Sequence, residues 1–282
     1  EIIEFKEASK NQKKINICNS GIMAFDYSSL NLVKKIDNKN KKKEYYLTDI
    51  VKLSRESRLK INLVLAQNEN NAVGVNDQIE LLEAEKIMQD RLRKKFIKQG
   101  VKFVDANTVY LSSDTQIGKN VKIEPFVVIG KKVKIGNNVV IKSFSHLEET
   151  MIKNKVEIGP YARLRPGSIL EENSKIGNFV EIKKSKIGKG SKVNHLSYIG
   201  DALLGNKVNI GAGTITCNYD GKNKFKTVIE DSAFIGSNSS LIAPVKIGKN
   251  SLVGAGSSIS KNVKGNSLAL TRAEQKNLRK KR

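Results

Sequence analysis

An apolar residue recurs at every sixth position through the second half of this 282-residue chain. The first unbroken run consists of Ile117, Ile123, Ile129, Ile135, Ile141 and Leu147. After slips in register, similar runs continue as far as Ile259. A helix, with a period of about 3.6, and a plain strand, with a period of about 2, both place their apolar residues differently. A hexapeptide array gives this spacing, because each repeat supplies one short strand and one corner of a parallel β-helix. The sequence therefore predicts a parallel β-helix.

The residues before the repeats follow another pattern. Residues 1–78 are expected to form part of an α/β domain, with strands at 15–22 and 60–66 and a helix at 49–55 between them. The apolar alternation of the first segment and the apolar run of the second carry the strand assignments. This part of the chain is predicted to be a domain separate from the β-helix.

A helix is expected to link the two parts. Asp77 is a good N-cap residue, and a charged helical pattern follows it over residues 79–100, where Gly100 is a helix stop signal. The β-helix is then expected over residues 101–282. Residues 211–228 break the six-residue spacing, so a loop is predicted to leave the β-helix there.

Composition limits the possible functions. The formal net charge of +23 favours an anionic substrate, whereas the low aromatic content of 6% argues against stacking on nucleic acid bases. Cys18 and Cys217 fit neither a disulfide framework nor a metal-binding spacing, which indicates a reducing, cytoplasmic location. No apolar run approaches the length needed to span a membrane, and no membrane insertion is expected.

Two cations are predicted to stack in the β-helix. Three hexads complete one coil, so residues 18 apart lie above one another at about 4.8 Å. Arg165 and Lys183 have this spacing and each directly follows an apolar repeat residue. Their repulsion of about 1 kcal/mol in water would be relieved by a bound anion. The pair therefore suggests a phosphate site, although two solvated surface cations would give the same sequence.

The chain has two histidines, His146 and His195. Two imidazoles cannot form a three-histidine zinc site within one chain. His195 lies in a stretch where polar residues interrupt the plain repeat, whereas His146 is expected to be an exposed residue without a role. His195 is therefore the candidate for chemistry.

Five segments resemble one enzyme family. They are residues 44–49, 158–167, 177–184, 188–195 and 209–221. In order along nearly the whole chain, they are similar to the bacterial bifunctional N-acetylglucosamine-1-phosphate uridyltransferase and glucosamine-1-phosphate N-acetyltransferase. This resemblance implies a left-handed β-helix, a homotrimer and active sites between subunits. It also implies acetyl transfer from acetyl-CoA to glucosamine-1-phosphate, giving N-acetylglucosamine-1-phosphate.

The resemblance also assigns residues of the acetyltransferase site. It makes His195 the general base, a role that suits an imidazole near pH 7, and Glu181 the residue that orients it. Arg165 and Lys183 correspond to sugar-phosphate contacts, in agreement with the stacking argument. The other implied sugar-phosphate contacts are Tyr198, Asn209 and Lys224. The implied acetyl-CoA contacts are Ala212, Asn218, Tyr219, Ser237, Ala255 and Arg272, with Asn218 and Tyr219 beside the acetyl group.

The N-terminal half corresponds to only part of the family's uridyltransferase domain. Glu4 and Asn19 correspond to sugar contacts, and Asn76 to a residue at the Mg²⁺ site. The Gly-rich nucleotide loop with its catalytic Arg and Lys, and the Asp that holds magnesium, have no counterpart in this sequence. Asn76 alone cannot hold Mg²⁺, which prefers octahedral oxygen coordination. The chain is therefore predicted not to make a UDP-sugar from UTP. The complete protein is expected to make UDP-N-acetylglucosamine for cell-wall or outer-membrane synthesis.

Three other functions remain open from the sequence. A hexapeptide acyltransferase could use another acceptor on the same scaffold. The β-helix could instead be a non-catalytic trimeric platform. A basic nucleic-acid binder is the third, and it would show steeply salt-dependent binding to duplex DNA.

Overall fold

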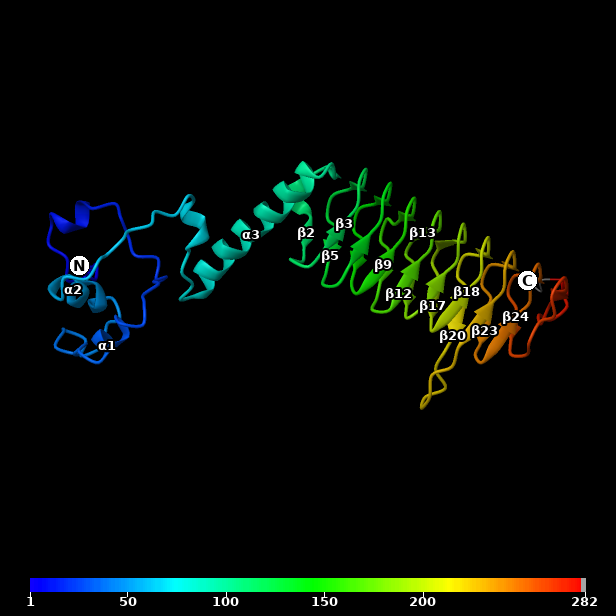
Figure 1. The fold of residues 1–282 in the computed structure, drawn as a ribbon. Coiled ribbons are helices and arrows are strands. Elements are labelled where there is room, and N and C mark those ends of the chain that lie inside the picture. Colours follow the sequence, from blue (N-terminus) through cyan, green and yellow to red (C-terminus); the bar gives the residue numbers. More distant parts are fainter. Residues whose placement is uncertain (280–282) are drawn as a thin grey trace. The chain divides into compact units, whose positions relative to one another are not determined.

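The structure is a computed structural model that describes residues 1–279, and it contains two compact units. The first comprises residues 1–87, and the second begins at Met88. Most of the second unit is a parallel β-helix, seen in Figure 1 as a regular stack of short strands. The predicted parallel β-helix of hexapeptide repeats is confirmed. The hand of its coil stays a prediction from the resemblance.

Three parallel sheets form the walls of the β-helix. The first sheet contains β1 (Lys102–Phe103), β4 (Lys122–Ile123), β7 (Val140–Ile141), β10 (Glu157–Ile158), β13 (Lys175–Asn178), β16 (Lys192–His195), β19 (Asn209–Ile210), β22 (Phe234–Ile235), β25 (Leu252–Val253) and β27 (Leu268–Ala269). The second contains β2 (Tyr110–Leu111), β5 (Val128–Ile129), β8 (His146–Leu147), β11 (Arg163–Leu164), β14 (Glu181–Lys183), β17 (Tyr198–Gly200), β20 (Ile215–Cys217), β23 (Ser240–Ile242) and β26 (Ser258–Ile259). The third contains β3 (Gln116–Ile117), β6 (Lys134–Ile135), β9 (Thr150–Ile152), β12 (Ser168–Leu170), β15 (Lys186–Ile187), β18 (Ala202–Leu204), β21 (Thr227–Ile229) and β24 (Val245–Ile247).

The strand register explains the slips in the sequence pattern. In the second sheet Leu147 pairs with Leu164 and Leu164 with Ile182, so one coil is a residue shorter than the next. The expected loop is confirmed between β20 and β21, where Tyr219 and Lys224 form an isolated antiparallel bridge. The pairing resumes beyond this loop, with Ile215 opposite Ser240.

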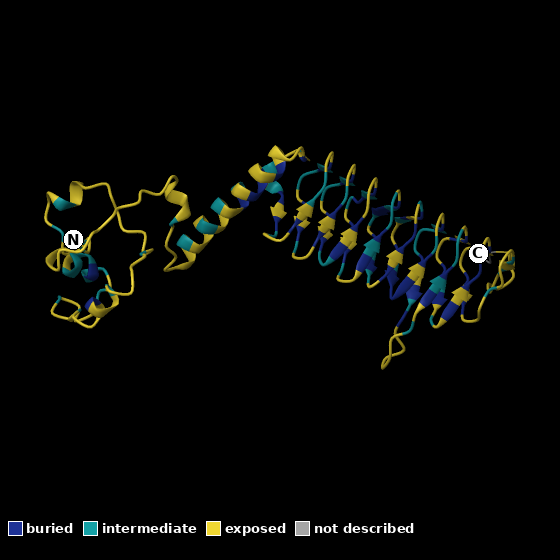
Figure 2. Ribbon diagram, viewed as in Figure 1, coloured by how far each residue is buried: buried dark blue, intermediate teal, exposed yellow. Residues whose placement is uncertain are grey.

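The repeated apolar residues fill the interior of the coil. Ile123, Leu147, Ile182 and Leu241 are each fully buried, and Figure 2 shows the buried positions running along the strands. Removing this apolar surface from water drives the coils to stack, at about 25 cal/mol per Å². Every neighbouring coil also supplies backbone partners, so strands of two or three residues form a continuous ladder.

One corner of the β-helix carries a column of stacked aromatic rings. Phe126, Phe144, Tyr161 and Phe179 follow one another in successive coils, with ring centroids 4.8–5.1 Å apart. All four residues have φ between 53° and 60°, which turns the chain from the first sheet into the second. The column stiffens this corner as far as the coil that contains Asn178.

Helix α3 (Gln78–Lys98) protects the first coil of the β-helix. Gln89 exchanges two hydrogen bonds with the backbone of Leu111, at 2.8 and 2.9 Å, and the guanidinium of Arg93 donates to the carbonyl of Val109. These side chains satisfy backbone groups at the end of the sheet, which would otherwise be an open edge. Asp77 accepts from the backbone N–H of Ile79 and Glu80, confirming it as the N-cap.

The first unit contains short helices but, among its described residues, none of the expected strands. The helices are α1 (Leu30–Val33) and α2 (Asp49–Glu56), with 3₁₀ turns at Gln12–Lys14 and Glu69–Asn71. Helix α2 confirms the helix expected at 49–55. The strands expected at 15–22 and 60–66 are wrong for this chain: both segments are extended or irregular, without strand partners. A strand needs a neighbour for its backbone N–H and C=O groups, and these segments have none.

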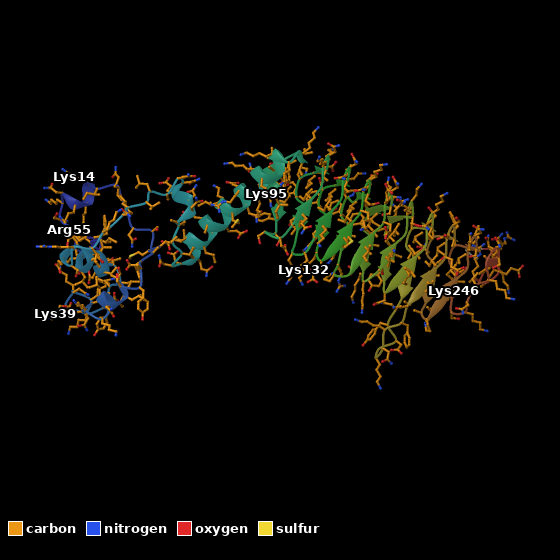
Figure 3. All side chains as sticks on the ribbon, in the orientation of Figure 1. Lys14, Lys39, Arg55, Lys95, Lys132 and Lys246 are labelled. Carbon is orange, nitrogen blue, oxygen red and sulfur yellow. The ribbon has the colours of Figure 1, made fainter. Side chains whose placement is uncertain are left out.

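No helix among residues 1–279 is long and apolar enough to cross a membrane. The basic side chains labelled in Figure 3, among them Lys39 and Lys246, come from both units. The net positive charge is thus distributed along the chain rather than gathered on one element.

Candidate active site

Three cations converge where the second sheet turns toward the third. Arg165 follows β11, Lys183 ends β14, and Lys224 reaches in from the loop after β20. The pKa of Lys183 is lowered, first by its hydrogen bond with Lys224, then by desolvation, and further by the positive charges of Lys224 and Arg165. A bound anion would relieve this repulsion, so the anion site predicted from Arg165 and Lys183 stays a prediction.

Glu181 belongs to this cation cluster rather than to His195. Its carboxylate accepts a hydrogen bond from Arg165 Nη1 at 2.8 Å, and this interaction raises the pKa of Arg165. Within the single chain Glu181 thus contacts Arg165 and His195 contacts Asn178, and the orienting role of Glu181 stays a prediction. The reason is register: Glu181 pairs with Tyr198, three residues beyond His195, and its side chain is engaged by the stacked Arg165.

Asp201 and Asn218 form a buried pair beside the cations. Both side chains are 7% exposed, and Asn218 Nδ2 donates to Asp201 Oδ2 at 2.5 Å. The backbone N–H of Asp201 donates to the carbonyl of Lys183, which fixes the turn after β17. The Asp201 carboxylate also attracts the ammonium of Lys183. The pair therefore holds Asn218 in place and partly balances the cation cluster.

Tyr198 begins β17, the strand that runs from the corner after β16 to the corner of the cation cluster. A Cβ atom on Gly200 would meet the Tyr198 hydroxyl at 2.4 Å, so only glycine at 200 leaves room for the ring. Asn209 begins β19 in the first sheet and is half-buried. Tyr198 pairs with Glu181 and influences the pKa of Arg165, which places it beside the cations, whereas Asn209 lies in another sheet.

His195 stands at the corner where the first sheet turns into the second. It is the last residue of β16, its side chain is exposed, and its Nδ1 lies 2.6 Å from Asn178 Oδ1. His146 is exposed, as expected, and lies on a regular strand, β8. The strand β17, about 10 Å long for three residues, separates the corner of His195 from that of the cations.

The corner of His195 continues as a column of small residues. The carbonyl of His195 accepts from Gly213, that of Ala212 from Asn238, and that of Ser237 from Gly256. This backbone ladder aligns His195, Ala212, Ser237 and Ala255 in successive coils. Arg272 ends the column, donating from Nη1 to the carbonyl of Ala255 at 3.0 Å. The corner positions that carry rings in the preceding coils carry Leu196, Gly213, Asn238 and Gly256 here, so beyond Leu196 no large side chain occupies them.

The amino-acid sequence is similar to those of known proteins. The family model described as bacterial transferase hexapeptide (six repeats) matches residues 114–148 and 226–261. The bifunctional protein GlmU of Zymomonas mobilis is 50% identical over 278 residues, covering 98% of this chain and 61% of the relative. GlmU of Paramagnetospirillum magneticum is 48% identical and that of Bartonella quintana 49%, covering 99% and 97% of this chain. The chain is a GlmU homologue that carries bacterial transferase hexapeptide repeats.

The chain spans about three fifths of the length of these GlmU relatives, 61–62%. The comparison therefore covers almost all of this sequence but leaves a large part of each relative unmatched.

The residues expected in the uridyltransferase half are not brought together into a metal site. Glu4 and Asn19 are exposed in the first unit, and both the backbone N–H and Nδ2 of Asn76 donate to Glu80 Oε2, at 2.6 and 3.1 Å. Within residues 1–279, no group of three or more His, Cys, Asp or Glu residues could hold a metal ion. One amide and one carboxylate do not provide the octahedral oxygen set that Mg²⁺ prefers. We therefore derive no step through magnesium.

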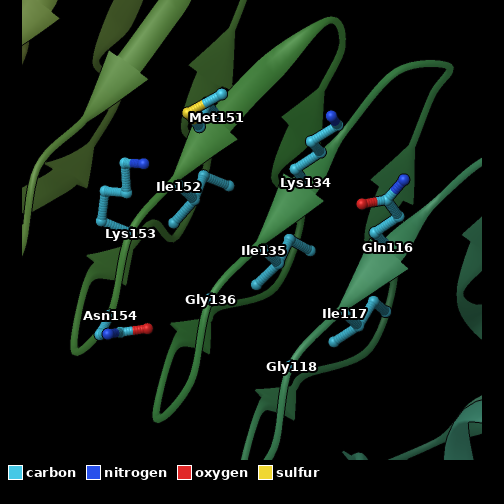
Figure 4. A pocket seen from close by; sticks show the side chains of 10 residues that line it. All are labelled: Gln116, Ile117, Gly118, Lys134, Ile135, Gly136, Met151, Ile152, Lys153 and Asn154. Atoms are coloured by element: carbon cyan, nitrogen blue, oxygen red, sulfur yellow. The ribbon is translucent and has the colours of Figure 1, made fainter.

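A pocket lies on the third sheet and is lined by none of the residues predicted for the acetyltransferase site. Figure 4 shows its lining from β3, β6 and β9, including Gln116, Lys134 and Asn154. It contains none of the predicted site residues. Its glycines, such as Gly118, are there because the next coil approaches closely: a Cβ on Gly118 would meet the backbone of Gly136 at 2.8 Å. Stacking of the coils therefore explains the depression.

Sequence reasoning missed Asn178 and Asp201. Asn178 lies 17 residues before His195, one short coil away, so the argument that stacked Lys183 on Arg165 could have found it. Asp201 follows Gly200 at a corner and contacts Asn218 only because the loop after β20 returns there. No spacing rule anticipates that contact.

Proposed function

We propose that the chain transfers the acetyl group of acetyl-CoA to the amine of glucosamine-1-phosphate, giving N-acetylglucosamine-1-phosphate. The observation that carries the proposal is the convergence of Arg165, Lys183 and Lys224 from coils on both sides of the one that presents His195. A phosphate among these cations would relieve the repulsion that lowers the pKa of Lys183. The sugar would then lie along β17, with its amine toward the corner of His195.

His195 acts as the general base in this mechanism. Its free ring nitrogen takes a proton from the amine as the amine nitrogen attacks the thioester carbonyl. The new C–N bond forms, the C–S bond breaks, and His195 returns the proton to the departing thiolate as CoA. Its exposed position at the corner leaves the ring accessible to both substrates.

Acetyl-CoA fits the column of small residues that follows His195. Ala212, Ser237 and Ala255 present no large side chain along three coils, which leaves space for the pantetheine arm. Arg272 at the end of the column would pair with a cofactor phosphate. Asn218, held by Asp201, and Tyr219 would lie beside the acetyl group, and Asn209 beside the sugar.

The chain acts as a homotrimer in this proposal, with sites completed between subunits. Support comes from the resemblance of the sequence to a trimeric family and from the exposure of the His195 side chain. Light scattering of the purified chain tests this point directly, because a monomer would contradict it. Uridylyl transfer is not part of this proposal, because the chain spans only 61% of the length of the GlmU relative from Zymomonas mobilis.

The test is release of free CoA thiol from acetyl-CoA with a panel of acceptors. Glucosamine-1-phosphate should support release, whereas glucosamine without phosphate should support little, because the cation cluster would have no ligand. Preference for another amine-bearing or hydroxyl-bearing sugar would favour a different acceptor on the same scaffold. A folded chain that releases no thiol with any acceptor would support the non-catalytic platform instead.

A further inference from the structure

The contact between Asn178 and His195 has a chemical consequence for the base. His195 Nδ1 lies 2.6 Å from Asn178 Oδ1, and the two residues are paired across the register of β13 and β16. An amide oxygen only accepts hydrogen bonds, so the ring nitrogen facing it must carry the proton. Nε2 is then left with a free lone pair directed away from Asn178.

We propose that Asn178 is a positioning residue that locks His195 as the Nδ1–H tautomer and presents Nε2 to the substrate amine. This inference rests on the proposed function for its catalytic meaning, though not for its structure. The ring nitrogens of histidine are distinct, and the partner of one nitrogen decides what the other can do. Without an acceptor at Nδ1, nothing at this exposed corner would select the tautomer that acts as base.

Asn178 is itself held on two sides. Its carbonyl accepts from the backbone N–H of Leu196, next to His195, at 3.1 Å. Phe179, the following residue, stacks on Tyr161 with ring centroids 5.0 Å apart, at the end of the aromatic column. The amide therefore projects from a corner that both the backbone ladder and the ring stack keep in place.

A glycine brings the two residues within reach. A Cβ on Gly177 would lie 1.9 Å from the carbonyl oxygen of Asn194, so no other residue fits where these coils approach. Asn178 and His195 are the next residues along the same two strands. The close approach at 177 thus sets up the short contact one position later.

A neutral amide suits this position better than a carboxylate. Glu181, the acidic residue of the same corner segment, is engaged with Arg165 and leaves His195 to Asn178. An amide orients the ring without placing a negative charge beside it, so it does not hold a proton on the base. In this arrangement the charged Glu181 side chain contacts the cation cluster, and the neutral Asn178 side chain orients the imidazole of His195.

The tautomer can be read directly by NMR because the chain has only two histidines. The protein would be labelled with ¹⁵N-histidine and studied at a pH where both rings are neutral, with His146→Gln to assign the signals. We expect Nδ1–H for His195 in the wild type and in Asn178→Asp, and its loss in Asn178→Leu. An Nε2–H ring in the wild type, or an unchanged ring in Asn178→Leu, would overturn the proposal.

Kinetics separates this role from a purely structural one. Asn178→Leu should lower kcat roughly 10- to 100-fold, part of the ~10²–10⁴-fold that a positioned base contributes, with little change in KM for the acceptor. Asn178→Asp, which still accepts from Nδ1, should recover much of the rate. Asn107→Leu, an exposed asparagine elsewhere in the β-helix, is the matched control and should behave as wild type.

The NMR and kinetic measurements distinguish failure of the proposed function from failure of the positioning role. An Nδ1–H tautomer that depends on Asn178 in a chain without transferase activity would sink the proposed function and keep the structural inference. Full activity in a folded Asn178→Leu variant would sink the positioning role and leave the proposed function standing. Circular dichroism and the melting temperature of each variant show whether it is folded.

Discussion

The apolar segment at 60–66 and the strands of the β-helix have similar residues, but only the latter are buried and paired as strands. Leu63, Val64 and Leu65 are 67–88% exposed, whereas Leu164 is 1% exposed. Each β-helix strand finds a partner above and below from its own chain, one coil away. Residues 60–66 and 15–22 find none within the described chain. The difference shows that a strand-like sequence becomes a strand only where a neighbouring backbone is supplied.

The largest expected contrast is in amide hydrogen exchange. Amides in the buried strands, such as that of Ile182, should exchange on the order of 10⁴-fold more slowly than those of residues 60–66, because strand opening approaches global unfolding. Exchange measured by mass spectrometry on peptic fragments checks this. Strong protection of residues 15–22 or 60–66 would break the comparison, since it would show that these segments are paired.

Matched leucine truncations give the next largest effect. Leu164→Ala should destabilise the β-helix by about 2–5 kcal/mol, through lost burial and the cavity left behind. Leu63→Ala should change the same unfolding transition by less than about 0.5 kcal/mol, since it removes an exposed side chain. Urea unfolding of both variants measures the two values. Equal losses would mean that residue 63 packs in a core.

The cation cluster should contribute a smaller effect, seen in binding. Lys183→Ala removes one partner of a charge-assisted contact worth about 1.5–3 kcal/mol, so KM for glucosamine-1-phosphate should rise about 10- to 100-fold. Lys39→Ala, an exposed lysine of the first unit, is the control and should leave KM unchanged. A similar rise in both variants would show a general effect of net charge instead of a site.

The smallest effect is the pH dependence of stability that arises from Lys183. Its pKa is lower in the folded chain than the ordinary 10.5, so between these values the unfolded chain binds more protons and stability rises with pH. Below both pKa values Lys183 is protonated in the folded and the unfolded chain, so it adds no further pH dependence to the stability. Lys183→Met should remove this slope and also abolish stabilisation by added phosphate, as measured by thermal unfolding. A slope that persists in Lys183→Met would have to come from other groups.

The sequence was informative wherever the contact is set by the repeat. The six-residue period predicted the β-helix, and the spacing of 18 predicted that Lys183 stacks on Arg165, which the pairing of Leu164 with Ile182 confirms. The same coil geometry brings Asn178 to His195, but a slip shortens that spacing to 17. A slip is a coil that is one residue shorter, and the apolar pattern alone does not fix the residue at which it occurs.

Contacts set by a single loop could not be predicted this way. Asp201 meets Asn218 because the segment after β20 leaves the coil and returns through the Tyr219–Lys224 bridge. The strands expected in the first unit were wrong for the converse reason. Their residue pattern is local, but the neighbours that a strand needs are not.

Transfer of an isotopic label tests the central claim most directly. The chain would be incubated with acetyl-CoA labelled with ¹³C at the carbonyl, together with glucosamine-1-phosphate, and the sugar product followed by NMR. The account predicts a labelled amide on the sugar nitrogen, formed at least about 10²-fold more slowly by His195→Ala. Label found only as free acetate, or formed equally by the variant, would contradict the proposed reaction and its base.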